Sequence, residues 1–287
     1  MEITASLVKR LREETDAPMM DCKRALTQAA EKLGAEATED TVLAEAKQIL
    51  RESGKVQAGK RADRATSAGT VAVAKSGNAA AAVSLLSETD FVARNEDFKA
   101  LAQKLADHFV QNDPGDDPLS AVIDGKTVKE LIEDAVAKIR ENIQLGAVKR
   151  ISSEGAVGVY VHHDSTKAAL VALANSGNGY EDLASKIGIQ VVALSPEFIS
   201  KDGVDQDRLE KEIAIERQRA IEDGKPEEIA EKIAQGKVNK EFLQQVVLTE
   251  QAWYADQSKR TAEVMGGAKV TRFIRIEAGK PPTDTTV

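Results

Sequence analysis

Residues 69–86 read GTVAVAKSGNAAAAVSLL, and residues 155–173 read GAVGVYVHHDSTKAALVAL. In each stretch, two runs of small and β-branched residues flank a short polar segment, which is typical of a β-hairpin. Because the same pattern occurs twice, we expect two related structural units.

The segments after the two hairpins support this interpretation. A helix of matching apolar pattern is expected from Phe98 to Leu105 after the first hairpin and from Tyr180 to Ile187 after the second. A further strand is expected later in each copy, at 147–151 and at 268–276. The fold class predicted is therefore α+β, with two related repeats that contain antiparallel sheets.

The first 54 residues predict a separate unit of three short helices. The first helix begins after a possible N-cap at Thr4, and the second runs from Met19 to Leu33 and ends at Gly34. The apolar face of the third helix stops at Gly54. Residues 55–68 have few large apolar side chains and are interpreted as a linker, with the alternative that part of this stretch is helical.

The repeats set the remaining domain limits. The first repeat is assigned to 69–152 and the second to 153–280, with a tail at 281–287. The second repeat carries an insertion at about 205–238, where two amphipathic segments flank the turn Gly224-Lys-Pro. This pattern predicts an inserted αα-hairpin.

Composition narrows the class of function. A net charge of -8 argues against a general nucleic-acid binder, which needs a basic face. The local exception is a basic run at Lys55, Lys60, Arg61 and Arg64, which leaves open the alternative of a ribosome- or RNA-associated protein. The sequence has no segment that resembles a membrane span or a signal peptide, and it has a single cysteine, so a cytoplasmic location is expected.

No pattern in the chain predicts an enzyme, a metal site or a bound cofactor. His162 and His163 are adjacent, so their side chains are expected to point to opposite faces of a strand. Cys22 has no second thiol and no nearby histidine in sequence. Thr127 and Glu130 are interpreted as a capping box that opens a helix. An enzyme with its site between the repeats is the rival interpretation, but no grouping of titratable residues supports it.

The clearest candidate site is the segment Glu88–Asn95, where the first repeat is longer than the second. This polar segment contains Phe91, in a chain in which only 3% of residues are aromatic. One alternative is that Phe91 packs back on the following helix as a hydrophobic staple, with Asn95 as the helix cap. The other is that the ring is presented to a partner protein, where its burial would contribute about 1.5 to 3 kcal/mol.

Two motifs resemble a known family. Residues 11–26 read LREETDAPMMDCKRAL, and residues 88–94 read ETDFVAR. Further agreement lies in SPEFI at 195–199, GKPEEIAEK at 224–232 and TRFIR at 271–275. The chain resembles the bacterial elongation factor Ts family, the nucleotide exchange factors of the GTPase elongation factor Tu.

The resemblance implies a function and a set of contact residues. It implies that the first domain is a ubiquitin-associated-like three-helix fold that docks on the GTPase, in a 1:1 or a 2:2 complex. Its contact residues would be Arg12, Met19, Met20 and Lys23. The resemblance also implies that the helical hairpin is a coiled coil.

The second motif would carry the exchange activity. Its partner-binding residues would be Thr89, Asp90, Phe91 and Val92. The ring of Phe91, with Asp90 alongside, would disturb the Mg²⁺ site of the GTPase so that GDP is released and GTP can bind. The protein itself would need no cofactor and no direct contact with nucleic acid.

Overall fold

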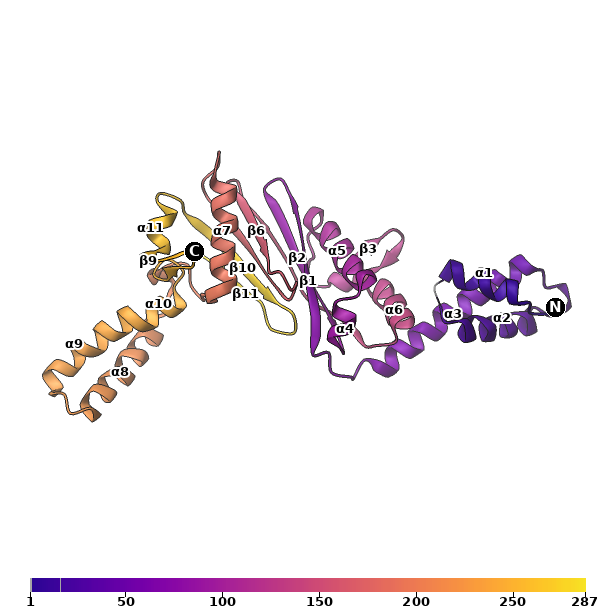
Figure 1. The fold of residues 1–287 in the computed structure, drawn as a ribbon, viewed down its shortest axis with the longest axis horizontal. Helices are drawn as coiled ribbons and strands as arrows, with labels where there is room; N and C mark the ends of the chain where they lie inside the picture. Colours follow the sequence, from indigo (N-terminus) through magenta and orange to yellow (C-terminus); the bar gives the residue numbers. More distant parts are fainter. Residues whose placement is uncertain (1, 16) are drawn as a thin grey trace. The chain divides into compact units, whose positions relative to one another are not determined.

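The computed structural model describes residues 2–15 and 17–287 (Figure 1). The chain divides into two compact units, and three segments contribute to each. The first unit comprises residues up to 69 together with 85–99 and 115–146. The second comprises 70–84, 100–114 and 147–287.

The first unit begins with a bundle of three helices, α1 (Ala5–Thr15), α2 (Met19–Leu33) and α3 (Glu39–Arg61). The Thr4 hydroxyl accepts a hydrogen bond from the Leu7 backbone N–H at 3.2 Å, which confirms it as the cap of α1. Helix α2 ends at Gly34, whose φ of 68° is accessible to glycine at little cost. The helices bury a small core that includes Leu11, Cys22, Leu26 and Val42.

The prediction that the third helix ends at Gly54 was wrong, because α3 continues to Arg61. Gly54 is buried, and a Cβ built on it would lie 3.0 Å from the Cβ of Ala137. The glycine therefore permits a close approach between α3 and helix α6 (Val128–Ile139) instead of terminating the helix. Half of the expected linker, residues 55–61, is thus helical, and the domain limits drawn from the sequence remain a prediction.

The first expected hairpin forms as β1 (Ala68–Ser76) and β2 (Ala79–Ser87), which join β5 (Ile143–Ser152) in a sheet of order β1-β2-β5. Between β2 and β5 lie the one-turn helix α4 (Asp90–Ala93), α5 (Glu96–Gln111) and α6. A short 3-10 turn, η2 (Pro118–Ser120), and the two-residue strands β3 (Val122–Ile123) and β4 (Lys126–Thr127) precede α6. The predicted capping box is confirmed, since Thr127 and Glu130 exchange hydrogen bonds at the start of α6.

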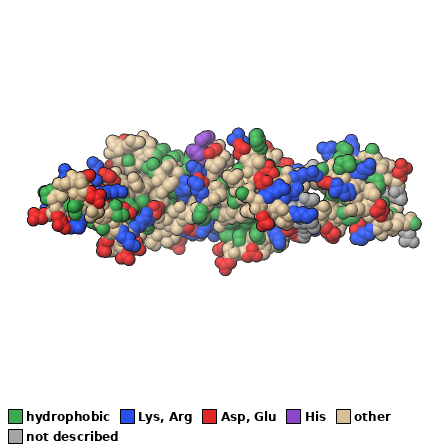
Figure 2. Space-filling model, turned by 90° about the horizontal axis from the view of Figure 1, so that it is seen from below, with side chains coloured by type: hydrophobic (Ala, Val, Ile, Leu, Met, Phe, Trp, Pro, Cys, Tyr) green, Lys and Arg blue, Asp and Glu red, His purple; other side chains and the backbone are tan. Residues whose placement is uncertain are grey.

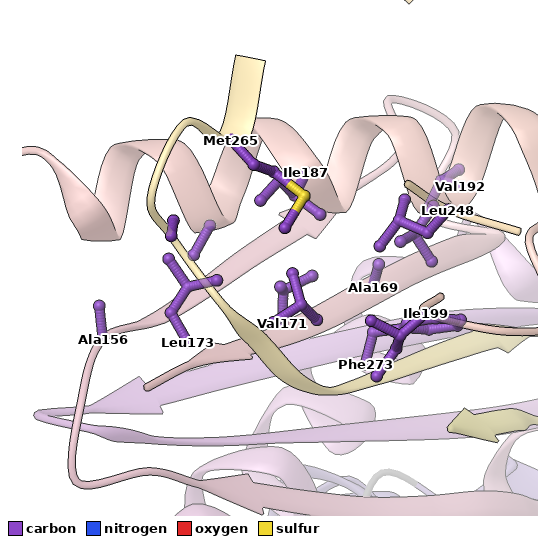
Figure 3. Close-up of a cluster of buried hydrophobic side chains, with 14 of the residues drawn as sticks. Ala156, Ala169, Val171, Leu173, Ile187, Val192, Ile199, Leu248, Met265 and Phe273 are labelled. Carbon is purple, nitrogen blue, oxygen red and sulfur yellow. The ribbon is translucent and has the colours of Figure 1, made fainter. Parts of the chain in front are cut away.

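The second unit contains a four-stranded sheet of order β11-β10-β7-β6. Its strands are β6 (Val157–Val161), β7 (Lys167–Leu173), β10 (Val270–Glu277) and β11 (Thr283–Thr286), and neighbouring strands are antiparallel. Helix α7 (Tyr180–Leu194) covers one face of this sheet, and side chains such as Val171, Ile187 and Phe273 fill the space between them (Figure 3). The second predicted hairpin and the strand at 268–276 are therefore present.

The insertion in this unit contains α8 (Gln206–Glu222) and α9 (Glu227–Lys237), which pack side by side (Figure 1). Helix α9 continues through a π-helical turn at Val238–Phe242 into α10 (Leu243–Val246). The strands β8 (Ala252–Trp253) and β9 (Asp256–Arg260) and the short helix α11 (Thr261–Met265) then lead into β10. None of the described helices combines the length and apolar composition that crossing a membrane requires.

Candidate functional site

The segment that carries Phe91 forms a single capped helical turn. Thr89 is the N-cap of α4, and its hydroxyl accepts a hydrogen bond from the Val92 backbone N–H at 3.4 Å. The guanidinium of Arg94 donates to the Asp90 carboxylate at 2.9 Å, one turn apart. The four predicted residues Thr89, Asp90, Phe91 and Val92 therefore lie together on one short, ordered turn.

Phe91 is exposed to an unusual degree for an aromatic residue. Its side chain is 83% exposed, whereas Phe98, Phe109 and Phe273 are completely buried. The alternative that Phe91 packs back as a hydrophobic staple is therefore wrong. The other half of that alternative is right, because the Asn95 side chain caps α5 by accepting from the backbone N–H groups of Asp97 and Phe98.

A second segment of the same unit fixes the base of this turn. The Glu141 carboxylate accepts hydrogen bonds from both the backbone N–H and the hydroxyl of Thr89, at 3.0 and 2.7 Å. The Asn142 backbone N–H donates to the Glu88 carboxylate at 2.6 Å. The buried Asn142 side chain donates to the backbone carbonyls of Ala62 and Arg64, at 3.2 and 2.6 Å. Glu141 and Asn142 could not be recognised from the sequence, since no motif distinguishes them from other polar residues between a helix and a strand.

The second predicted set of contact residues lies on α1 and α2. Met19 and Met20 begin α2 and are 54% and 67% exposed, whereas Cys22 on the same helix is fully buried. Arg12 and Lys23 are also exposed. Within the described part of the chain neither cation forms an ion pair, so both are available to an acidic partner surface. The structure thus presents two apolar thioether side chains close in sequence to two cations.

The histidine pair does not have the geometry expected from the sequence. The rings of His162 and His163 lie against each other with centroids 4.3 Å apart, so the expectation that they point to opposite faces was wrong. They lie where β6 gives way to the turn after Val161, and there the strict alternation of a strand no longer holds. The Tyr160 hydroxyl contacts His162 Nδ1 at 3.1 Å. Over residues 2–15 and 17–287, no three metal-binding side chains converge.

Cys22 lies in the core of the three-helix bundle. Burial raises the pKa of its thiol, and the Sγ atom donates to the Ala17 carbonyl oxygen at 3.4 Å. A thiol with a raised pKa is a poor nucleophile near neutral pH because little thiolate is present. The structure therefore supports the interpretation of Cys22 as a small buried residue.

The basic run begins on α3 and extends past the end of this helix. Lys60 and Arg61 belong to the helix, and Arg64 donates to the Glu88 carboxylate at 3.4 Å. The side chain of Lys55 lies outside the described residues. On the face drawn in Figure 2, basic and acidic side chains are interspersed. Arg64 is thus engaged with the base of the Phe91 turn, which reduces the cationic character of the run.

Comparison with known proteins agrees with the two motifs. Residues 88–280 match the protein family described as elongation factor TS. The chain is 40% identical over 274 residues to elongation factor Ts of Deinococcus deserti and 39% identical over 274 residues to that of Deinococcus radiodurans. Each alignment covers 95% of this chain and 98% of the relative. The chain therefore belongs to the elongation factor Ts family of translation elongation factors.

Proposed function

We propose that this protein is a guanine-nucleotide exchange factor that binds the GDP form of elongation factor Tu and accelerates GDP release. The observation that carries the proposal is the 83% exposure of Phe91 on a turn that is capped and held at its base. Exposing a phenyl ring to water costs free energy that its burial in a partner would recover, about 1.5 to 3 kcal/mol. The choice of elongation factor Tu as the partner rests on membership of the elongation factor Ts family.

The proposed mechanism acts on the metal of the GTPase. In P-loop GTPases a Mg²⁺ ion bridges phosphate oxygens and helps to hold the nucleotide. A ring inserted beside that metal site, with Asp90 next to it, would displace elements that hold the Mg²⁺ shell. The protein would stabilise an open, nucleotide-free state of its partner and would make or break no covalent bond itself.

Docking through the N-terminal helices would provide the second contact. Met19 and Met20 would enter an apolar site on the GTPase, while Arg12 and Lys23 would pair with acidic groups. Because binding free energies are coupled, a factor that weakens GDP binding is itself bound more weakly by the GDP form. Incoming nucleotide would then release the factor.

The remaining sequence-based expectations fit this proposal. The two α+β halves would be related repeats that form the body of the protein, and α8 with α9 would be a coiled-coil insertion. Light scattering of the mixture with the GTPase would separate a 1:1 from a 2:2 complex. The RNA-binding alternative receives no support from the basic run, because Arg64 is paired within the chain.

Displacement of fluorescent GDP from elongation factor Tu tests the proposal. The intact protein should accelerate release, and Phe91→Ala should slow the maximal stimulated rate by about 10- to 100-fold, from the loss of about 1.5 to 3 kcal/mol. Val122→Ala is a matched control, because Val122 is another exposed apolar residue of the same unit. Circular dichroism should show the same helix content in all three proteins.

The same assay distinguishes the metal-based mechanism from simple docking. With a chelator that removes Mg²⁺, GDP release no longer requires displacement of the metal, so the difference between the intact protein and Phe91→Ala should shrink. A difference that stays the same without Mg²⁺ would exclude the metal step. Absence of stimulation by the intact protein would exclude the exchange function.

A further inference from the structure

We propose that Glu141 is a positioning residue for Phe91, a role that rests on the proposed exchange function. The Phe91 ring is largely surrounded by water, so packing within this chain does little to fix its direction. The ring direction must therefore be set by the backbone of the turn that carries it. The residues that anchor this turn therefore contribute to binding by orienting the ring, although they need not touch the partner.

The contact between Glu141 and Thr89 is the anchor that acts on the N-cap of α4 itself. One carboxylate oxygen accepts from the Thr89 backbone N–H at 3.0 Å and the other from its hydroxyl at 2.7 Å. Hydrogen bonds to an ionised acceptor are stronger than those between neutral groups. Both groups of Thr89 are therefore held by a single side chain.

This contact also orients the cap of α4. The Thr89 hydroxyl donates a hydrogen bond to Glu141, which leaves an oxygen lone pair to accept from the Val92 backbone N–H at 3.4 Å. The result is a chain of hydrogen bonds from the carboxylate through Thr89 to Val92. Phe91 lies between the two linked residues, so the chain of bonds spans the residue whose ring is to be presented.

The chain around Glu141 is itself fixed on both sides. Arg140 ends α6 in the left-handed conformation, with φ of 68°, and its backbone N–H donates to the Val136 carbonyl at 2.8 Å. Its guanidinium pairs with Asp21 on α2. On the other side, Asn142 is buried and is bonded to the carbonyls of Ala62 and Arg64. A carboxylate held between two fixed residues can hold a turn in place.

Glu141 is only half-buried, so its loss should affect the ring more than the fold. Glu141→Gln keeps the length of the side chain but replaces one acceptor oxygen by a donor, which cannot accept from Thr89. The maximal rate of GDP release at saturating factor should fall about tenfold, as expected for loss of one hydrogen bond to a charged group. The factor concentration at half-maximal stimulation should stay within about twofold, because the surface on α2 is untouched.

Two controls match the change in chemistry and in location. Asp164→Asn alters another carboxylate that accepts from a threonine N–H and hydroxyl, those of Thr166, far along the chain in the second unit. Asp134→Asn makes a carboxylate-to-amide change in the first unit, on α6, where Asp134 accepts from Lys126 at 2.6 Å. Both variants should stimulate GDP release at a maximal rate within about twofold of the intact protein.

Two further measurements identify a positioning role. Hydrogen exchange of Glu141→Gln should be faster in the amides of residues 89–94 and unchanged in α2 and in the β6–β7 hairpin. The double variant with Phe91→Ala should release GDP no more slowly than Phe91→Ala alone, because both changes act through the same ring.

The outcomes separate this inference from the function on which it rests. Stimulation by the intact protein that is lost in Phe91→Ala but unchanged in Glu141→Gln would overturn the positioning role alone. The positioning role would also be overturned if the effects of Glu141→Gln and Phe91→Ala on the release rate were additive in the double variant. Unchanged hydrogen exchange of the amides of residues 89–94 in Glu141→Gln would overturn it too. If the intact protein does not stimulate GDP release, the proposed nucleotide-exchange function is wrong. The hydrogen-exchange measurement would still show whether Glu141 holds the turn in place.

Discussion

Gln190 and Gln251 form a hydrogen-bonded pair of buried side-chain amides, with Gln190 Nε2 donating to Gln251 Oε1 at 3.1 Å. The Gln190 amide also donates to the Ala252 carbonyl at 3.0 Å and accepts from the Tyr254 backbone N–H at 2.8 Å. The Gln251 amide donates to the carbonyls of Leu194 and Gln245, at 3.2 and 2.9 Å. The pair therefore fastens the β8–β9 hairpin to the end of α7.

Replacing Gln190 by leucine should destabilise the second unit by about 3 kcal/mol, because the Gln251 oxygen, the Ala252 carbonyl and the Tyr254 N–H would lose buried partners. Urea unfolding measures the change. Gln218→Leu is the matched control, since Gln218 is exposed and donates to Glu222 on its own helix. Equal unfolding midpoints for the two variants would contradict the role assigned to the buried pair.

Gly158 should tolerate no side chain, because β6 lies against the backbone of α7 at this point. A Cβ on Gly158 would lie 2.2 Å from the Ser185 nitrogen and 2.4 Å from the Ala184 carbonyl carbon. Backbone atoms cannot move aside as a flexible side chain can, so Gly158→Ala should cost about 3 kcal/mol or more, measured by thermal unfolding.

Gly236→Ala, in contrast, is expected to increase the stability of the protein. Gly236 lies inside α9, and a Cβ there would meet no atom of the described residues within 4 Å. Because alanine has a higher helix propensity than glycine, this variant should gain about 0.5 to 1 kcal/mol. Destabilisation of both variants by similar amounts would show that close packing does not explain the effect at Gly158.

Helix ends that depend on local chemistry were predictable from the sequence, and those that depend on distant contacts were not. Gly34 ends α2 where the pattern placed the end, because a left-handed glycine cap is a local device. Gly54 looked equivalent, but it allows α3 to pack on Ala137, which lies in a helix much later in the chain. A pattern that covers one helix contains no information on that contact.

In the candidate site, too, the residues that depend on local chemistry were predictable from the sequence, and those that depend on distant contacts were not. The sequence indicated Phe91 through a longer loop and a scarce residue type, and it indicated Asn95 as a cap. Glu141 could not be found in this way, because its contact with Thr89 joins residues that are 52 positions apart. Only the folded chain brings together the side chains that hold the turn.

Asp284 should make stability depend on pH. Burial raises the pKa of its carboxyl, but hydrogen bonds from Arg272 and Lys149, at 2.8 and 3.0 Å, outweigh burial and lower it below the ordinary value. A group whose pKa is lower in the folded state stabilises the fold above its unfolded pKa, about 3.9, and this stabilisation is lost as the pH falls through the folded pKa.

Asp284→Asn should therefore be less stable than the intact protein at pH 7 by about 0.5 to 1 kcal/mol, since it loses charge-assisted bonds that solvent partly screens. The difference should narrow below about pH 4, where the carboxyl of the unfolded chain becomes protonated, and should disappear as the pH falls through the lower pKa of the folded state. Urea unfolding at several pH values measures it, with the exposed Asp116→Asn as control. A difference that is constant from about pH 7 to about pH 3 would exclude the ionised carboxylate as its source.

Met20 should govern affinity for elongation factor Tu, whereas Phe91 should govern the rate of release. Met20 is 67% exposed at the start of α2, and transfer of its thioether into an apolar site would be worth about 1.5 kcal/mol. Met20→Ser should thus raise the half-saturating concentration about tenfold and leave the maximal rate within about twofold. Val122→Ser, which removes another exposed apolar side chain of the same unit, should change neither quantity.

This separation depends on where each side chain is expected to act. A docking contact that is equally strong before and after the nucleotide leaves cancels from the maximal rate, so its loss appears only in the concentration required. A contact made only in the open state of the GTPase does not cancel, and its loss appears in the rate. A Met20→Ser variant with normal half-saturation and a reduced maximal rate would therefore place Met20 in the exchange step, and the division of labour between the two surfaces would be wrong.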